Sequence, residues 1–460
     1  MRISDLTWRK AMQRLAGAGS AAAAEPPRNF IPKLEGNLRN IVAFWYPATL
    51  DRTNGGYIIN HDAAGKPNPG GSKGIVTQAR QLWLFSRLAR GGYHDSQQMA
   101  EAADHGFAFL RDKMWDPQHG GFVWEVDVSG TNVIRPGKSI YGQSFGLYAL
   151  SEYARVSNSK AALDLANELF TLFEKHAYDR QFGGYRESFN PDWSMLPAGQ
   201  GGYLSVTPDL KLMNTHLHLL ESVTTYYRAA QSQTALQRLA ELIIIESSSV
   251  LRKKLNVCTD KYERNWTPRL DAEKHWNRVS YGHILENVWL LADACRALDS
   301  SPYPLVDLFR DLWTYGLKYG YDAKYGGFWA SGPFDAAADD RRKVWWVQAE
   351  AIVSALCMYR LTKDARYWDV FIKTYDFIDK YQTDWKSGEW HESVAPDLKP
   401  NGAKAHIWKA GYHNGRAMIE CLEVLRENVK SLHNSSPWEH VFHPEKQAYH
   451  DLLGYTIAKP

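Results

Sequence analysis

The sequence predicts an all-α fold, an (α/α)6 barrel of about twelve helices with short β-hairpin arms in the loops. Two observations carry this prediction. A loop signature, Asp-x3-Gly-Gly-aromatic, recurs along the chain, and apolar residues between its copies recur at helical spacing. Repetition at a fixed period indicates stacked or ringed units. Six units around one mouth favour a closed barrel over an open solenoid, which would need polar capping helices.

The signature has four intact copies and two degenerate ones. The intact copies span Asp51–Tyr57, Asp116–Phe122, Asp179–Tyr185 and Asp322–Phe328. A fifth copy, Asp384–Trp390, has Glu in place of the second Gly, and we assign an eroded sixth copy to Asp260–Trp266. These starts divide the chain into six units, each with room for two helices.

Helical periodicity predicts two helices in each unit. The stretches lie near residues 32–46, 73–90, 97–113, 139–157, 160–176, 211–230, 233–252, 280–298, 303–318, 343–361, 364–381 and 411–429. We expect the Gly-Gly-aromatic strings to form the hairpin arms. The longest non-periodic stretch, residues 190–211, is expected to be a loop at the rim of the barrel.

The repeats cover most of the 460 residues, which predicts a single barrel domain over residues 30–430. Residues 1–29 are expected to be a disordered leader, and residues 431–460 a C-terminal tail that packs on or extends from the barrel. The leader faintly resembles a signal peptide, but Arg14 interrupts its Ala- and Gly-rich middle. We therefore expect a cytoplasmic protein, with a periplasmic or secreted location as the alternative.

Composition excludes several classes of function. A net charge of +3 is too small to indicate binding to nucleic acid or to an anionic membrane. No apolar run approaches the roughly 20 residues that span a bilayer. The four cysteines form no C-x-x-C pair and are interpreted as buried free thiols. A small-molecule substrate and a monomer or weak homodimer are the partners expected.

Each unit carries an unusual polar or aromatic string where its second helix begins. Equivalent positions in a ring of equivalent units point toward one place, so we expect a single site. The strings are Gln78–Arg80, Ser139–Tyr141, Asn214–His218, Gly282–Glu286, Trp345–Glu350 and Gly411–Arg416.

Helical spacing sorts the residues within these strings. Asn214 and His218 are four apart and share a face, whereas His216 points elsewhere and is expected to be structural. His283 and Glu286 are three apart, so the carboxylate could orient the imidazole.

Arg80 lies in a mostly apolar stretch and is expensive to bury unpaired. It needs either a ligand or a structural ion pair with Glu286 or Glu350. The sequence contains no His-Glu-x-x-His string, no P-loop and no strand-linked G-x-G-x-x-G, so metal and nucleotide chemistry are weakly supported.

The strings resemble those of the N-acylglucosamine 2-epimerase superfamily, most closely its cellobiose 2-epimerase branch. The resemblance covers roughly residues 33–427. It is carried by Lys73–Gly74, Gln78–Trp83, Tyr141–Phe145, Met213–His218, Tyr281–His283 with Glu286, Trp345–Trp346 with Gln348–Glu350, and Trp408–Lys409 with Tyr412–Arg416. Ile284 departs from the pattern, because the family usually has Asp directly after this histidine.

The resemblance implies a barrel enzyme that needs no metal or redox cofactor. It implies reversible inversion at C2 of the reducing-end hexose of a β-1,4 disaccharide such as cellobiose, by ring opening and two-histidine proton transfer through a cis-enediolate. The family's catalytic histidines match His283 and His413, and its enediolate-stabilising arginine matches Arg80. The further matching positions are His218, Glu286 and Glu350 for catalysis, and Tyr141, Asn214, Trp345, Trp346 and Trp408 for substrate binding.

Three alternatives remain open. The first is an aldose–ketose isomerase, or a 2-epimerase of free mannose, glucose or an N-acylhexosamine. The second is an (α/α)6 glycoside hydrolase with Glu286 and Glu350 as its carboxyl pair, which leaves the histidines and Arg80 without a role. The third is a non-catalytic carbohydrate-binding protein that keeps Trp346 and Trp408 for stacking.

Overall fold

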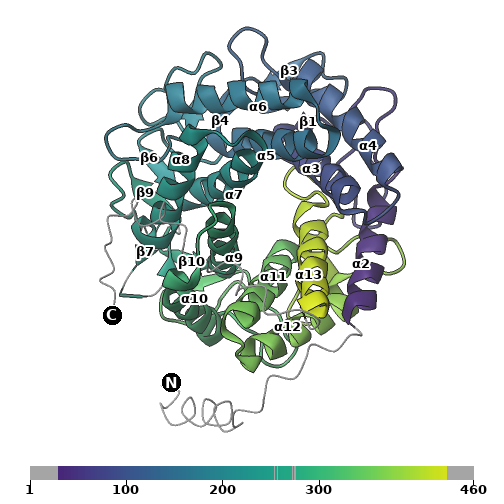
Figure 1. The fold of residues 1–460 in the computed structure, drawn as a ribbon, viewed down its shortest axis with the longest axis vertical. Coiled ribbons are helices and arrows are strands. Elements are labelled where there is room, and N and C mark those ends of the chain that lie inside the picture. Colours follow the sequence, from purple (N-terminus) through teal and green to yellow (C-terminus); the bar gives the residue numbers. More distant parts are fainter. Residues whose placement is uncertain (1–29, 253, 256, 272, 274–275, 432–460) are drawn as a thin grey trace.

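The computed structural model describes residues 30–431 except 253, 256, 272, 274 and 275. The leader and nearly all of the predicted tail lie outside the described residues, so both stay predictions. Within the described residues, twelve α-helices form two concentric rings (Figure 1). All twelve predicted helical stretches are confirmed, and none of the described helices has the length and apolarity required to cross a membrane.

The two rings alternate along the chain, because each unit contributes an outer helix and then an inner one. The inner helices are α3 (Ile75–Gly91), α5 (Ile140–Ser157), α7 (Met213–Ala230), α9 (Tyr281–Ala297), α11 (Trp345–Thr362) and α13 (Tyr412–Ser431). The outer helices are α2 (Phe30–Trp45), α4 (Ser96–Phe109), α6 (Lys160–Leu172), α8 (Gln233–Ile244), α10 (Val306–Tyr319) and α12 (Ala365–Phe377). A short 3-10 turn, η4 (Tyr303–Leu305), precedes α10.

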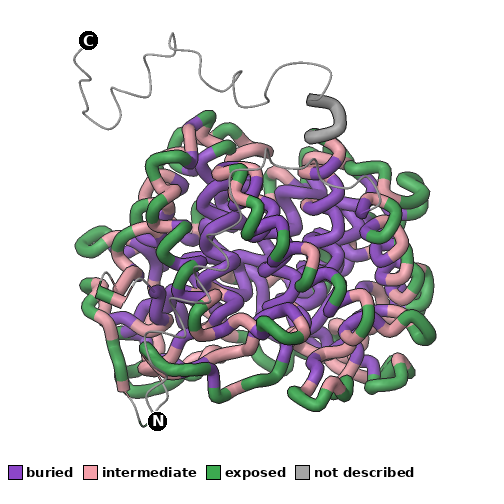
Figure 2. The backbone as a smooth tube through the Cα atoms, turned by 90° about the horizontal axis from the view of Figure 1, so that it is seen from below, coloured by how far each residue is buried: buried purple, intermediate pink, exposed green. Residues whose placement is uncertain are grey.

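Burial distinguishes the rings. Every residue of α5 from Ile140 to Ala154 is buried, whereas α6 buries only the stripe formed by Ala162, Ala166, Leu169 and Phe170. Figure 2 shows the same contrast, with buried segments inside and exposed ones on the outside. A helix that is covered all round must be apolar on every face, so polar residues on the inner helices need a specific reason.

Four outer helices end in a single π-helical turn. These turns are η1 (Leu110–Met114) after α4, η2 (Phe173–Ala177) after α6, η3 (Ile245–Ser249) after α8 and η5 (Ile378–Gln382) after α12. The turn recurs at one place in the repeat, directly before the signature loop.

The signature forms the same closed loop in five repeats. In the first copy, Gly55 N donates to Asp51 O at 2.8 Å and Asp51 N donates to Gly56 O at 3.0 Å. Both glycines have positive φ, +81° and +67°, in the left-handed region that Gly tolerates best. The Asp carboxylate also accepts from a buried Lys of the strand or loop before the inner helix. These pairs are Asp51–Lys73, Asp116–Lys138, Asp179–Lys211, Asp322–Lys343 and Asp384–Lys404.

The sixth signature copy predicted at Asp260–Trp266 is wrong. Pairing of Leu251 with Cys258 places the loop of this repeat ahead of Asp260. Asp260 O accepts the backbone N–H of Met213, the first residue of α7, at 2.8 Å. One repeat earlier, Glu187 O accepts the backbone N–H of Ile140, the first residue of α5, at 2.9 Å. Asp260 is thus the equivalent of Glu187, and the loop of this repeat has lost its signature residues.

Short antiparallel strands join each repeat to the next. These pairs are β1 (Lys73–Gly74) with β2 (Glu125–Val126), β4 (Lys138–Ser139) with β5 (Ser188–Phe189), β6 (Leu210–Leu212) with β9 (Lys261–Glu263), β10 (Arg278–Ser280) with β11 (Ser331–Pro333), and β12 (Lys343–Val344) with β13 (Ser393–Val394). Hairpin pairing within a repeat occurs where β3 (Val133–Arg135) pairs with β2, β14 (Pro400–Asn401) with β13, and β7 (Leu251–Arg252) with β8 (Val257–Cys258).

The last repeat also joins the first. His61 N donates to Ala405 O, and Lys404 N donates to Asp62 O, each at 3.0 Å. The strand contacts therefore run around the ring at the end where the inner helices begin.

Candidate active site

A cavity of about 200 Å³ opens where the inner helices begin. Its lining consists of ten of the eleven predicted site residues: Arg80, Tyr141, Asn214, His218, His283, Glu286, Trp345, Trp346, Trp408 and His413. All six inner helices contribute side chains to the lining, and Trp408 comes from the loop before α13. Glu350 lies behind the lining and is buried. The ring therefore brings the predicted strings together.

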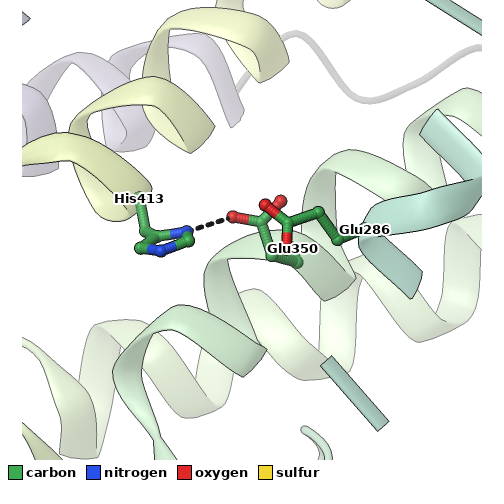
Figure 3. A group of neighbouring side chains, drawn as sticks. All are labelled: Glu286, Glu350 and His413. Carbon is green, nitrogen blue, oxygen red and sulfur yellow. Dashed lines mark hydrogen bonds and ion pairs between the residues drawn. The ribbon is translucent and has the colours of Figure 1, made fainter. Parts of the chain in front are cut away.

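Glu350 orients the imidazole of His413. Figure 3 shows the contact, in which His413 Nδ1 lies 2.6 Å from Glu350 Oε1. Burial and the nearby Arg80 and Arg416 charges hold the pKa of His413 well below its usual range. The ring is therefore neutral, with Nδ1–H donated to the carboxylate, and Nε2 is the atom that can accept a proton.

His283 has a different environment. Its ring lies 4.8 Å from Trp346, centroid to centroid, and the Trp346 ring lies 5.8 Å from His413. Trp346 of α11 thus contacts both imidazoles, one from α9 and one from α13. Burial lowers the pKa of His283 to about 4, so this ring is also neutral near pH 7.

The predicted contact between Glu286 and His283 is wrong. Glu286 Oε1 accepts instead from Arg416 Nη2 at 2.9 Å, because the buried guanidinium is the stronger donor. Burial and the charge of Glu350 raise the pKa of Glu286 well above its usual range. This carboxyl group thus favours its protonated form beside the cavity.

Arg416 is the buried centre of the polar network. It donates to Glu221, to Glu286 and, at 2.8 Å, to Glu350. Burial would raise the pKa of Glu221, but the Arg416 charge, together with the contacts from His218 and Tyr412, lowers this pKa to about 2. Glu221 Oε2 in turn lies 3.1 Å from His218 Nδ1. Arg416 was not among the predicted site residues, although its position four residues after Tyr412 in an apolar helix is a usable signal.

Arg80 carries a charge that no described carboxylate compensates. Nη1 donates to Trp408 O at 2.7 Å and Nη2 to Tyr141 Oη at 3.1 Å. The alternative ion pair with Glu286 or Glu350 is wrong, since both carboxylates bind Arg416. Nε of Arg80 is buried and has no hydrogen-bond partner among the described residues. A buried cation of this kind suits a ligand that carries or develops negative charge.

His216 plays the structural role that its spacing predicts. Nε2 accepts from Tyr185 N at 2.9 Å, and Nδ1 lies 2.6 Å from Leu212 O. Gln78, Gln143 and Gln348 bind the aromatic residue of the signature loop in the same manner in other repeats.

Comparison with known proteins identifies the family. The profile describing N-acylglucosamine 2-epimerase (GlcNAc 2-epimerase) matches residues 56–417. The chain belongs to the N-acylglucosamine 2-epimerase family. It is 31% identical over 399 residues to the cellobiose 2-epimerase of Dictyoglomus turgidum, covering 84% of this chain and 95% of that protein.

Two further relatives bear on the activity of this family member. The structure of the cellobiose 2-epimerase of Spirochaeta thermophila superimposes with a TM-score of 0.78 at 31% identity, covering 88% of this chain and 100% of that one. The D-mannose isomerase of Marinomonas mediterranea is 24% identical over 402 residues, 85% of this chain and 97% of that protein. The chain is therefore an enzyme of the carbohydrate epimerase and isomerase class, with the (α/α)6 barrel that the sequence predicted.

One group in this epimerase-family site has ligand types that could hold a metal. Glu286, Glu350 and His413 place their ligand atoms within 4.8 Å of one another (Figure 3). Arg416 Nη2 donates to both carboxylates, so a guanidinium already supplies the positive charge that a metal ion would bring. The expectation of a metal-independent site stays a prediction.

Sequence analysis missed Glu187, which supports the site from the next repeat. Ser139 Oγ donates to its Oε1 at 2.5 Å, and Thr215 Oγ1 donates to its Oε2 at 2.6 Å. Tyr141 N also donates to Oε1, at 3.3 Å. Glu187 therefore links the start of α5 to the start of α7, next to Tyr141 and Asn214 of the cavity.

We expect Glu187 to make stability depend on pH. Burial raises its pKa to about 7 against the usual 4.5, so the folded state holds this proton more tightly than the unfolded state. The stabilisation is complete below pH 4.5 and is lost as pH rises through 7. Denaturant unfolding of the wild type and Glu187→Gln at pH 4 and 8 should show the difference changing by about 3 kcal/mol. A constant difference between the two proteins would contradict this assignment.

Proposed function

We propose that this enzyme reversibly inverts C2 of the reducing-end hexose of a β-1,4 disaccharide such as cellobiose. The observation that carries the proposal is the placing of two neutral imidazoles, His283 and His413, around one cavity with the uncompensated guanidinium of Arg80. The similarity to cellobiose 2-epimerases at about 30% identity supports the disaccharide as substrate.

The chemistry of the reaction accounts for these groups. The C2 proton of an aldose becomes acidic when the ring opens and C1 is an aldehyde. One imidazole removes this proton and becomes an imidazolium, and the other returns a proton to the opposite face. The second ring must be an imidazolium for this step, so one of the two rings, which are both neutral in the empty site near pH 7, takes up a proton before the reaction, and the pair then carries one extra proton throughout. Arg80 stabilises the negative charge of the cis-enediolate, an interaction of several kcal/mol at a preorganised site.

The remaining residues have supporting roles in this proposal. Glu350 fixes the tautomer of His413 through the bond to Nδ1. His218, bound to Glu221, assists ring opening or holds a sugar oxygen. Trp346 and Trp408 offer aromatic faces to the sugar, and the protonated Glu286 can donate to a hydroxyl group.

A second candidate is an aldose–ketose isomerase, which the similarity to D-mannose isomerases favours. It would form the same enediolate and return the proton to C1. Both reactions would use the network described above, and the carbon to which the proton returns distinguishes their products. Cytoplasmic location and a monomeric or weakly dimeric state remain predictions.

Proton NMR in D2O tests the proposal. With cellobiose, we expect deuterium at C2 together with a growing glucosyl-mannose signal. Deuterium at C1 of a ketose product would favour the isomerase, and free glucose would favour the hydrolase. Mannose, glucose and N-acetylmannosamine serve as comparison substrates. Absence of exchange with every sugar would overturn the epimerase proposal.

A further inference from the structure

Asp260 caps α7 from the neighbouring repeat. Its Oδ1 accepts the backbone N–H of Asn214 at 3.0 Å, and its carbonyl oxygen accepts that of Met213. The N-cap residue of α7, Leu212, has no side chain that could do this. Asp260 therefore anchors the turn that carries Asn214, and one turn later His218, into the cavity.

Asp260 and His283 also line the same cavity. A second cavity, of about 240 Å³, lies beside the catalytic one, and His283 lines both. Asp260 and Lys261 line this second cavity, together with Arg278. The carboxylate of Asp260 is the leading favourable charge for the protonated form of His283.

The other two histidines of the site each have a carboxylate on Nδ1. Glu350 binds His413, and Glu221 binds His218. Glu286, the carboxyl group nearest to His283 along its own helix, is bound to Arg416 instead. Within the described residues, this leaves His283 without a hydrogen-bonded carboxylate of its own.

The other charges around His283 do not substitute for Asp260. Lys261 pairs with Asp260 itself, and Arg278 pairs with the exposed Asp339. His218 and Lys261 oppose a positive charge on His283, while Glu350 favours it more weakly than Asp260 does.

We propose that Asp260 is the positioning residue of His283, supplying across the second cavity the negative charge that stabilises the imidazolium while holding the start of α7 in place. This inference rests on the proposed two-histidine function, because only that function requires His283 to carry a proton. The proton on His283 would then be available for return to C2, as the proton on His413 is in the opposite direction.

Asp260→Asn tests the proposal in the full-length protein. The amide keeps an oxygen for Asn214 N but removes the charge. We expect the His283 imidazole, followed by NMR titration of histidine-labelled protein, to titrate about one pH unit lower than in the wild type. We also expect kcat for epimerisation to fall about tenfold, with KM changed less than twofold. Asp260→Glu, which restores the charge, should recover most of both.

Glu187→Gln is the matched control, because Glu187 occupies the equivalent position in the preceding repeat and caps α5 rather than facing His283. It should leave the His283 titration unchanged. If folded Asp260→Asn and Asp260→Glu titrate alike, the proposal is overturned. The titration needs no turnover, so it still tests the Asp260–His283 pairing if the wild type exchanges no sugar proton and the proposed function fails.

Discussion

Replacing His413 by Asn should slow epimerisation strongly while leaving C2 hydrogen exchange in one of the two epimers. The two imidazoles lie on different inner helices, and each serves one face of C2 in the proposed reaction. His283 alone can still remove a proton and return deuterium to the same face. We expect the rate of inversion to fall by about 10²- to 10⁴-fold, the usual contribution of a general acid–base group.

The measurement compares deuterium incorporation into cellobiose and into glucosyl-mannose in separate D2O reactions. His283→Asn should give the complementary pattern, with exchange in the other epimer. His94→Asn, in the connection between α3 and α4, should behave as the wild type. Near-native inversion by either active-site variant would contradict the two-base mechanism.

The second large effect concerns stability. Arg416→Met should lower the free energy of unfolding by about 3–5 kcal/mol, because removing one partner of a buried ion network leaves uncompensated charge. Arg416 is almost fully buried and pairs with Glu221, Glu286 and Glu350. Urea denaturation followed by tryptophan fluorescence measures the change.

Arg342→Met is the control for this variant. Arg342 pairs with Asp340 at the surface, where its side chain is 60% exposed, and such pairs contribute about 0–1 kcal/mol. A loss below about 1 kcal/mol for Arg416→Met would show that the carboxyl groups are protonated or solvated when the guanidinium is absent.

Periodicity predicted the helices, and the equivalence of the six strings predicted the cavity lining except Trp408, which only the family resemblance indicated. An amphipathic or fully apolar helix leaves a pattern in its own sequence, and six equivalent strings had to meet if the ring closed. The predicted contact between Glu286 and His283 was wrong because i,i+3 spacing places two residues on one face of a helix but does not show which donor binds the carboxylate. Here the donor is Arg416, on another helix.

Contacts between repeats could not be predicted from the sequence for a similar reason. Glu187 and Asp260 act on helices of the preceding repeat, and no spacing along the chain reports such a contact. The sixth signature failed because one repeat had lost the pattern, and a chance Asp further along was matched in its place.

The strand contacts that join each repeat to the next affect how the barrel unfolds and whether its number of repeats can vary. The ring is closed by contacts between residues hundreds of positions apart, such as the hydrogen bond from Asn37 to Thr383. In an open solenoid a repeat can be added or removed at little cost, because each contacts only its neighbours. Here, deletion of one repeat would leave two unmatched edges and break the wall of the cavity. We therefore expect the barrel to unfold as one cooperative unit, and its lineage to vary in rim loops rather than in repeat number.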